Sequence, residues 1–334
     1  MTKARASGLA HYVEVAESLG LDPDRMLERA GLTRAMLRDP DRFIPGGAQS
    51  LLLEESARES GCEAFGLLVA ETRRISGLGT FSLLFRHQRT LRDAILVLIR
   101  YERLLADTLV ISLDEDAESA VIRTDIVTAY QMTRQSIESI VGEMHRGFVS
   151  LTGGRWRPES VHFVHPAPND LSVHRRIFDC PIQFESEFNG LSCTPGSLAL
   201  PILGAEPEIA RYAEDSVERL ARAVVEEGSV ADRMRRALHL LLPSGRGTLE
   251  GVGADLGMHP RALQRALLRE GANFGVVLND VRRELAQRHL ATPQLSIETI
   301  AVLVGYATLS SFSRWFTNEF GVPAGAWRLR KSPC

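Results

Sequence analysis

LEGVGADLGMHPRALQRALLREG, residues 249–271, and IETIAVLVGYATLSSFSRWFTNEFG, residues 297–321, are two copies of one sequence pattern. Each copy predicts a short helix, a turn at Gly257 or Gly305, and a second amphipathic helix. Glycine suits such a turn because it adopts a positive φ without steric cost. The sequence therefore predicts two helix-turn-helix units, joined by a helix over 274–290.

The charge of the chain is unevenly distributed. The 334 residues carry a formal net charge of −3, yet residues 231–334 hold 14 Lys and Arg against 8 Asp and Glu, and residues 1–230 hold 25 against 34. A local excess of positive charge is typical of a surface that meets the phosphates of nucleic acid. Combined with the duplicated pattern, it predicts double-stranded DNA as a partner, with two helices entering successive major grooves about 34 Å apart.

The rest of the chain predicts a mixed domain. Helical spacing dominates the first 70 residues, where Asp22 is placed to cap a helix that starts at Pro23. Strands are expected at 108–113 and 120–127, and an amphipathic helix over 137–151. The predicted fold class is an α+β N-terminal effector domain followed by an all-α DNA-binding domain with two helix-turn-helix units. The predicted boundaries are an effector and dimerisation domain over 1–205, a linker helix over 206–230 and the DNA-binding domain over 231–334.

Cysteine usage and the absence of targeting signals indicate the compartment. Cys62, Cys180, Cys193 and Cys334 have no CxxC spacing, which disfavours a zinc ribbon and a disulfide framework and predicts a reducing environment. The first ten residues lack the apolar stretch of a signal peptide, and the longest uncharged run, 188–205, is interrupted by proline and glycine. We therefore expect a cytoplasmic protein with no membrane partner.

Catalytic and metal chemistry is disfavoured. His162 and His165 are three positions apart on an expected strand, so their imidazoles face opposite sides and one metal ion cannot take both. Gly251, Gly253 and Gly257 follow no strand, which excludes a dinucleotide loop and a P-loop. No nucleophile elbow is present. We expect no metal, no cofactor and no enzyme activity, and a DNA-linked enzyme is a less favoured alternative.

Residues 248–328 resemble the DNA-binding domain of the AraC/XylS family of bacterial transcription regulators, on the two-copy pattern and on the motifs LSIETIAVLVGY and FSRWF. The resemblance implies that the second helix of each unit reads the major groove, where arginine suits guanine and glutamine suits adenine. The sequence differs from the usual residues of the family at three places, Gly253, Thr317-Asn318 and Ala324. These differences imply that the second unit binds DNA phosphates less strongly. The implied DNA-binding residues are Arg261, Gln264 and Arg265 in the first unit and Thr308, Leu309, Ser310, Ser311 and Arg314 in the second. Further phosphate contacts are expected from Arg282, Arg283, Arg328, Arg330 and Lys331.

The N-terminal part resembles the effector domain of one branch of that family, which includes ornithine-responsive and virulence regulators. The resemblance covers about residues 9–205. It rests on GLDPDRMLERAGL from Gly20, Ile44-Pro45, TLRDAILVLIRYERLL from Thr90, VHFVHPAPND from Val161 and CPIQFESEFNGL from Cys180. This domain type differs from the cupin barrel of the arabinose regulator, so neither that barrel nor its sugar site is implied. The implied function is sensing of a small-molecule effector.

An effector pocket is expected to be apolar with a few convergent polar groups. Arginines among those groups would favour a carboxylate, such as a fatty acid, an amino acid or an aromatic acid, through bidentate hydrogen bonds. The candidate effector-binding residues are Phe81, Phe85, Arg86, Tyr101, Arg134, His145 and Trp156.

The sequence thus predicts an effector-controlled transcription regulator that acts as a homodimer. Activation is favoured over repression. The regulator's partners would be DNA, the effector and RNA polymerase. The main alternative is an N-terminal domain that serves only dimerisation or protein contact, without a small ligand. A redox switch through Cys180 and Cys193 is disfavoured, because unpaired cysteines in folded domains are usually packing residues.

Overall fold

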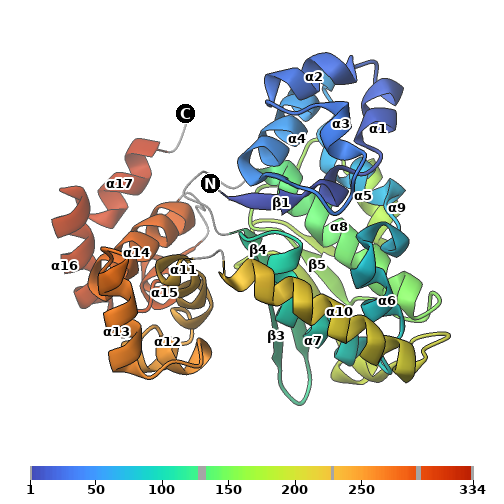
Figure 1. The fold of residues 1–334 in the computed structure, drawn as a ribbon. Helices are drawn as coiled ribbons and strands as arrows, with labels where there is room; N and C mark the ends of the chain where they lie inside the picture. The colour runs from blue at the N-terminus through green and yellow to red at the C-terminus, as the bar shows by residue number, and fades with distance from the viewer. Residues whose placement is uncertain (1, 127–132, 227–228, 291–294, 332–334) are drawn as a thin grey trace. The chain divides into compact units, whose positions relative to one another are not determined.

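Short helices form the first part of the chain, as its apolar periodicity predicts (Figure 1). Asp22 caps the second of them, since its carboxylate accepts hydrogen bonds from the backbone N–H groups of Asp24 and Arg25. These helices enclose a core of their own, built around fully buried Tyr12 and Phe65. The elements are α1 (Tyr12–Ser18), α2 (Pro23–Arg29), α3 (Arg34–Leu37), α4 (Gly46–Ser60) and α5 (Phe65–Thr72).

The structure is a computed structural model, and it describes residues 2–126, 133–226, 229–290 and 295–331. The chain divides into two units, Met1–Val224 and Val225–Cys334. Each unit has its own apolar core. The first unit is a mixed α/β domain with a sheet, and the second is helical, which confirms the predicted fold class.

The described residues of the first unit form two sheets. The strands expected at 108–113 and 120–127 are present as β3 (Leu109–Glu115) and β4 (Ala120–Ile126), which pair antiparallel. Val127, the last residue expected in the second strand, lies outside the described residues. These two strands form the edge of a five-stranded sheet of order β3-β4-β7-β5-β6, in which only β5 and β6 pair in parallel. The other strands are β5 (Ser160–His162), β6 (Ile182–Gln183) and β7 (Gly190–Cys193), and the second sheet is the antiparallel pair β1 (Lys3–Arg5) and β2 (Phe43–Pro45).

Two helices pack against the larger sheet and close its core. Thr90 begins the first of them with a capping box that it forms with Asp93. The apolar stripe of the second, including Ile137, Val141 and Phe148, is buried in the same core. These helices are α7 (Leu91–Tyr101) and α8 (Arg134–Leu151), accompanied by the shorter α6 (Thr80–Arg86) and α9 (Ser172–Phe178).

Helices α5 and α8 approach each other closely at glycine. The backbone N–H of Gly66 donates to Oε1 of Gln135 over 2.8 Å. A Cβ atom at Gly66 would collide with the backbone carbonyl of Gln135, and one at Gly142 would press on Leu67 and Ala70. Only glycine permits this distance between the two helices.

The helix expected as a connector is α10 (Pro207–Glu226). Ala213 and Val217 on its apolar stripe are buried in the core of the first unit. Arg100 of α7 forms ion pairs with Glu214 at 2.7 Å and with Glu218 at 3.1 Å. The first unit therefore includes nearly all of this helix.

The second unit consists of helices that follow the duplicated pattern. Val252, Leu263, Ile300, Phe312 and Phe316 are all fully buried in one core. None of the helices in the described part of the chain is apolar and long enough to span a membrane. The elements are α11 (Val230–Leu241), α12 (Leu249–Asp255), α13 (Pro260–Arg269), α14 (Phe274–Leu290), α15 (Ile297–Leu303), α16 (Leu309–Phe320) and α17 (Ala324–Lys331).

Candidate functional site

The turns of the two helix-turn-helix units have the geometry that their glycines predict. Gly257 lies at φ +64° and Gly305 at φ +78°. The helix that follows each turn is capped by a side chain. Nδ1 of His259 accepts from the backbone N–H of Arg261 at 3.3 Å, and Oγ1 of Thr308 accepts from that of Ser311 at 3.3 Å.

Helix α13 has one buried and one exposed face. Leu263 and Leu267 are buried in the core of the second unit. Arg261, Gln264 and Arg265, the residues implied to read bases, are all exposed. Donors and acceptors on this face are therefore free to meet a base edge or a phosphate.

Helix α16 repeats this arrangement. Phe312 and Phe316 are fully buried. None of Arg314, Arg261 and Arg265 forms an ion pair with a described residue. The exposed residues are Thr308, Leu309, Ser310, Ser311 and Arg314, the whole implied set of this unit.

Three arginines expected to contact phosphate are instead engaged within the second unit. Arg282 donates to the backbone carbonyls of Val304 and Gly305, each at 3.2 Å. Arg283 forms ion pairs with Glu319 and Asp280, and Nη2 of Arg328 donates to the carbonyl of Leu295 at 2.7 Å. These guanidinium groups hold helices together. The side chains of Arg330 and Lys331 lie outside the described residues.

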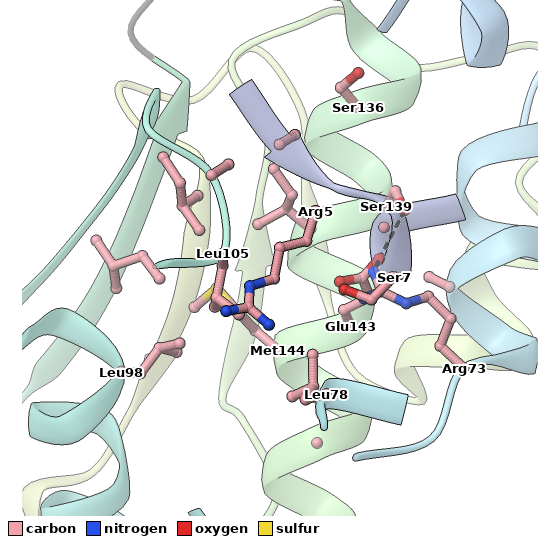
Figure 2. Close-up of a pocket in the computed structure, with 18 of the residues that line it drawn as sticks. Arg5, Ser7, Arg73, Leu78, Leu98, Leu105, Ser136, Ser139, Glu143 and Met144 are labelled. Carbon is pink, nitrogen blue, oxygen red and sulfur yellow. Dashed lines mark hydrogen bonds and ion pairs between the residues drawn. The ribbon is translucent and has the colours of Figure 1, made fainter. Parts of the chain in front are cut away.

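A cavity of about 1050 Å³ lies within the first unit (Figure 2). Its walls come from segments far apart in the sequence: the strand β1 with the 3₁₀ turn that follows it, the start of α4, the segment after α5, α7, β3 and α8. The volume is at the upper end of the range that binds small organic ligands. Polar and charged lining residues include Arg5, Ser7, Gln49, Ser50, Arg73, Arg74, Arg86, Ser136, Ser139, Glu143 and Arg146, and apolar ones include Leu78, Leu98, Leu105, Leu109, Ile111, Met144, Phe148, Leu151 and Ile202.

The polar part of the cavity is built around Arg73 and Glu143. Figure 2 shows these side chains pointing toward each other, and they form an ion pair. Oγ of Ser139 donates to Oε1 of the same glutamate at 3.1 Å. The Arg73 side chain is only 12% exposed, and this burial lowers its pKa to about 10. Arg73 therefore stays protonated at neutral pH.

Arg5 enters the cavity from β1. It donates to the carbonyl of Leu104 and pairs with Asp41. Its guanidinium carbon lies 5.6 Å from the ring centroid of Phe43 and 5.5 Å from that of Phe81, which are favourable cation–π distances. Burial lowers the pKa of Arg5, while Asp41 opposes that shift.

Two of the seven candidate effector residues line this cavity. Phe85 is a buried part of the wall, and Arg86 lines it from an exposed position. Phe81, Tyr101, His145 and Trp156 are buried in the main core and Arg134 is half-buried on α8, and none of these five lines the cavity.

Arg134 belongs to a separate buried cluster around Glu138. The Glu138 side chain is fully buried, and its Oε1 lies 2.9 Å from Nε of Arg134, 3.1 Å from Nε2 of His174 and 3.4 Å from Nε2 of His165. His162 lies elsewhere, between the hydroxyls of Ser160 and Ser186. Among the described residues, no group of three or more His, Cys, Asp or Glu side chains is placed to hold a metal ion.

The cysteines of the first unit are free thiols. Burial raises the pKa of Cys180 to about 11 and also raises that of Cys193. A protonated thiol is a poorer nucleophile than a thiolate.

Sequence reasoning missed the main charged residues of the cavity, Arg5, Arg73, Glu143 and Arg146. One signal was present: Ser139 and Glu143 are four residues apart on α8 and therefore share one side of that helix. Nothing local in the sequence connects them to Arg73 or to Arg5.

Two family descriptions match this chain. The one described as "Arabinose-binding domain of AraC transcription regulator, N-term" matches residues 20–202. The one described as "Helix-turn-helix domain" matches residues 252–330. Between them they cover parts of both units.

The chain is also similar to individual proteins over most of its length. It is 27% identical to the HTH-type transcriptional regulator VirS of Mycobacterium tuberculosis over 331 residues, 97% of this chain and 96% of the relative. It is 28% identical to the ornithine utilization regulator of Pseudomonas aeruginosa over 231 residues, 68% of this chain and 67% of the relative. Among solved structures, the transcriptional regulator CdpR from Pseudomonas aeruginosa is 20% identical with a TM-score of 0.43, over 92% of this chain and 96% of that one. The two relatives matched by sequence are both named as regulators.

Proposed function

Because the chain belongs to the AraC family of DNA-binding transcription regulators, we propose that it is a sequence-specific activator controlled by a small-molecule effector. The observation that carries the DNA half is the matched exposure of α13 and α16, each with a polar outer face over a buried apolar one. Such helices are the reading elements of helix-turn-helix proteins. We also propose a cytoplasmic location, because bacterial promoter DNA lies in that compartment.

The two recognition helices differ in chemistry. In α13, Arg261 and Arg265 are suited to guanine and Gln264 to adenine. In α16, Thr308, Ser310 and Ser311 offer hydroxyls that suit phosphate oxygens, Leu309 offers an apolar contact to thymine methyl groups, and Arg314 offers a further guanidinium. We therefore assign most base discrimination to the first unit.

Footprinting on upstream DNA tests the DNA half. The expected result is a protected site in which two half-sites are separated by one helical turn, with binding that weakens as salt concentration rises. If the protein protects no site and its DNA affinity does not change with salt concentration, the proposal of DNA binding is wrong.

The effector half rests on the cavity of the first unit. Its volume, its largely apolar wall and its few convergent charged groups are the features expected of a ligand site. A thermal-melt screen of the full chain against fatty acids, amino acids and aromatic acids tests it. A ligand at 100 times its dissociation constant should add about 2.7 kcal/mol of stability.

The alternative is a first unit that serves only dimerisation or protein contact. It predicts no saturable stabilisation by any metabolite in that screen. Control of transcription further requires that the effector bind more tightly to one of two states of the protein, so its effect on promoter affinity is the second readout. We propose a homodimer as the active form, with RNA polymerase as its partner at the promoter.

A further inference from the structure

The cavity carries more positive charge than its own carboxylates neutralise. Its charged lining residues in the described part of the chain are five arginines and Glu143. Arg5 is paired with Asp41, and Arg73 with Glu143. The remaining arginines, Arg74, Arg86 and Arg146, form no ion pair with any described residue. An anion inside the cavity would therefore be attracted, and a cation repelled.

Arg146 is the best placed of these three. It is half-buried, whereas the other two are exposed. Its Nε atom is buried and has no hydrogen-bond partner among the described residues. It follows Glu143 by three residues on α8, so it lies on the same side of that helix as the Arg73 ion pair. Arg146 lines the cavity and has no carboxylate partner among the described residues, so a ligand carboxylate would supply the missing counter-charge.

The larger part of the wall is apolar. Leu98, Met144, Phe148, Leu151 and Ile202 are each at most 9% exposed, and all line the cavity. A small polar ligand would leave most of the cavity of roughly 1050 Å³ filled with water, and that water would stay in unfavourable contact with the apolar side chains of the wall. A ligand with an extended apolar body would displace that water.

We propose that the effector is an amphipathic monoanion, a carboxylate on an alkyl chain, whose carboxylate pairs with Arg146 beside Arg73. Its chain lies along the wall formed by Leu98, Met144 and Leu151. This inference rests on the proposed effector function and specifies the ligand class. Arg73 is already paired with Glu143, so the ligand carboxylate pairs with Arg146 and leaves that ion pair intact.

The test is calorimetric titration of the full chain with hexanoate, octanoate, decanoate and, as the uncharged counterpart, 1-octanol. Each added methylene should tighten binding about fourfold, since it removes a fixed apolar area from water. Octanoate should bind at least about tenfold more tightly than 1-octanol, because a charge-assisted hydrogen bond is lost with the alcohol. These comparisons use only the wild-type protein, so they do not depend on whether a variant folds.

A matched pair of variants locates the carboxylate. Arg146→Gln should weaken octanoate binding about tenfold or more and leave 1-octanol within about twofold. Arg58→Gln removes the same charge from an exposed position on α4 outside the cavity, and it should change neither affinity.

The outcomes separate this inference from the proposed function. Equal binding of octanoate and 1-octanol, or affinity independent of chain length, would overturn the ligand class. Stabilisation by another metabolite, with no binding of any alkanoate, would also overturn it while leaving an effector-controlled regulator. Failure of every compound in both panels would remove the effector half of the proposed function as well.

Discussion

The guanidinium carbon of Arg282 lies 4.2 Å from the ring centroid of Tyr306, and the same side chain donates to the carbonyls of Val304 and Gly305. Arg282 belongs to α14 and Tyr306 to the turn between α15 and α16. The central helix of the second unit therefore holds the turn of the second helix-turn-helix by three interactions of one side chain.

Arg282→Ala should lower the free energy of unfolding by about 2 kcal/mol, because it removes two charge-assisted hydrogen bonds and a cation–π contact. Urea denaturation measures the loss. The matched control is Arg314→Ala on the exposed face of α16, which should leave stability within about 0.5 kcal/mol and weaken DNA binding. Equal stability of the two variants would show that Arg282 does not hold the turn.

Arg265→Ala should cost roughly 1–3 kcal/mol of DNA binding and relax base preference at one position of the site. The physical reason is the loss of a bidentate contact to guanine. Competition binding against single-base variants of the footprinted site measures it, with Arg58→Ala in the first unit as the control. A uniform loss across all sequences would mean that Arg265 contacts phosphate instead.

Glu138→Gln should destabilise the first unit by about 3 kcal/mol, because it removes the carboxylate that faces Arg134 and His174 in a buried site. Denaturant unfolding followed by tryptophan fluorescence measures the change, since Trp156 is buried in this unit. Glu187→Gln makes the same substitution at an exposed position and should be nearly neutral. A neutral Glu138→Gln would mean that the cluster adds nothing to stability.

Acid should destabilise the first unit through His145. Burial, and then the nearby Arg157 and Arg146, lower the pKa of this imidazole to about 4, so the unfolded chain binds its proton first. The stability that the neutral ring contributes is present above about pH 6.5 and is lost as the pH falls toward 4, to a total of about 3 kcal/mol.

The check is the free energy of unfolding as a function of pH for the wild type and for His145→Phe. The replacement keeps an aromatic ring between Trp156 and Phe178, which the imidazole now contacts. The variant should lose less stability than the wild type between pH 6.5 and 4. Some dependence of the unfolding free energy on pH should remain, because burial also lowers the pKa values of His162 and His165. Parallel curves for the two proteins would exclude His145 as a source.

The elements that could be predicted from the sequence carry their signals locally. Asp22 caps a helix where predicted, and α14 spans the predicted 274–290. The pairing of β1 with β2 was missed because it joins residues 3–5 to 43–45 with no hairpin turn between them. Pairing between distant segments depends on tertiary packing, which local patterns do not encode.

The two candidate sites also differ in whether local sequence patterns could predict them. The exposed face of α16 follows from periodicity, because burying Phe312 and Phe316 leaves Arg314 outside. The cavity instead combines Arg5, Arg73 and Arg146 from three distant segments. Candidate residues chosen as aromatic or charged neighbours of apolar stripes, such as Trp156, were core residues.

Gly66 lets α5 anchor α8 through its main chain, independently of the side chains that face the cavity. Substitutions at Glu143, Met144 or Arg146 can therefore change what the cavity accepts while the helix stays in register. Ligand preference is then free to drift during evolution on a scaffold that does not change. Relatives that share this scaffold need share no effector.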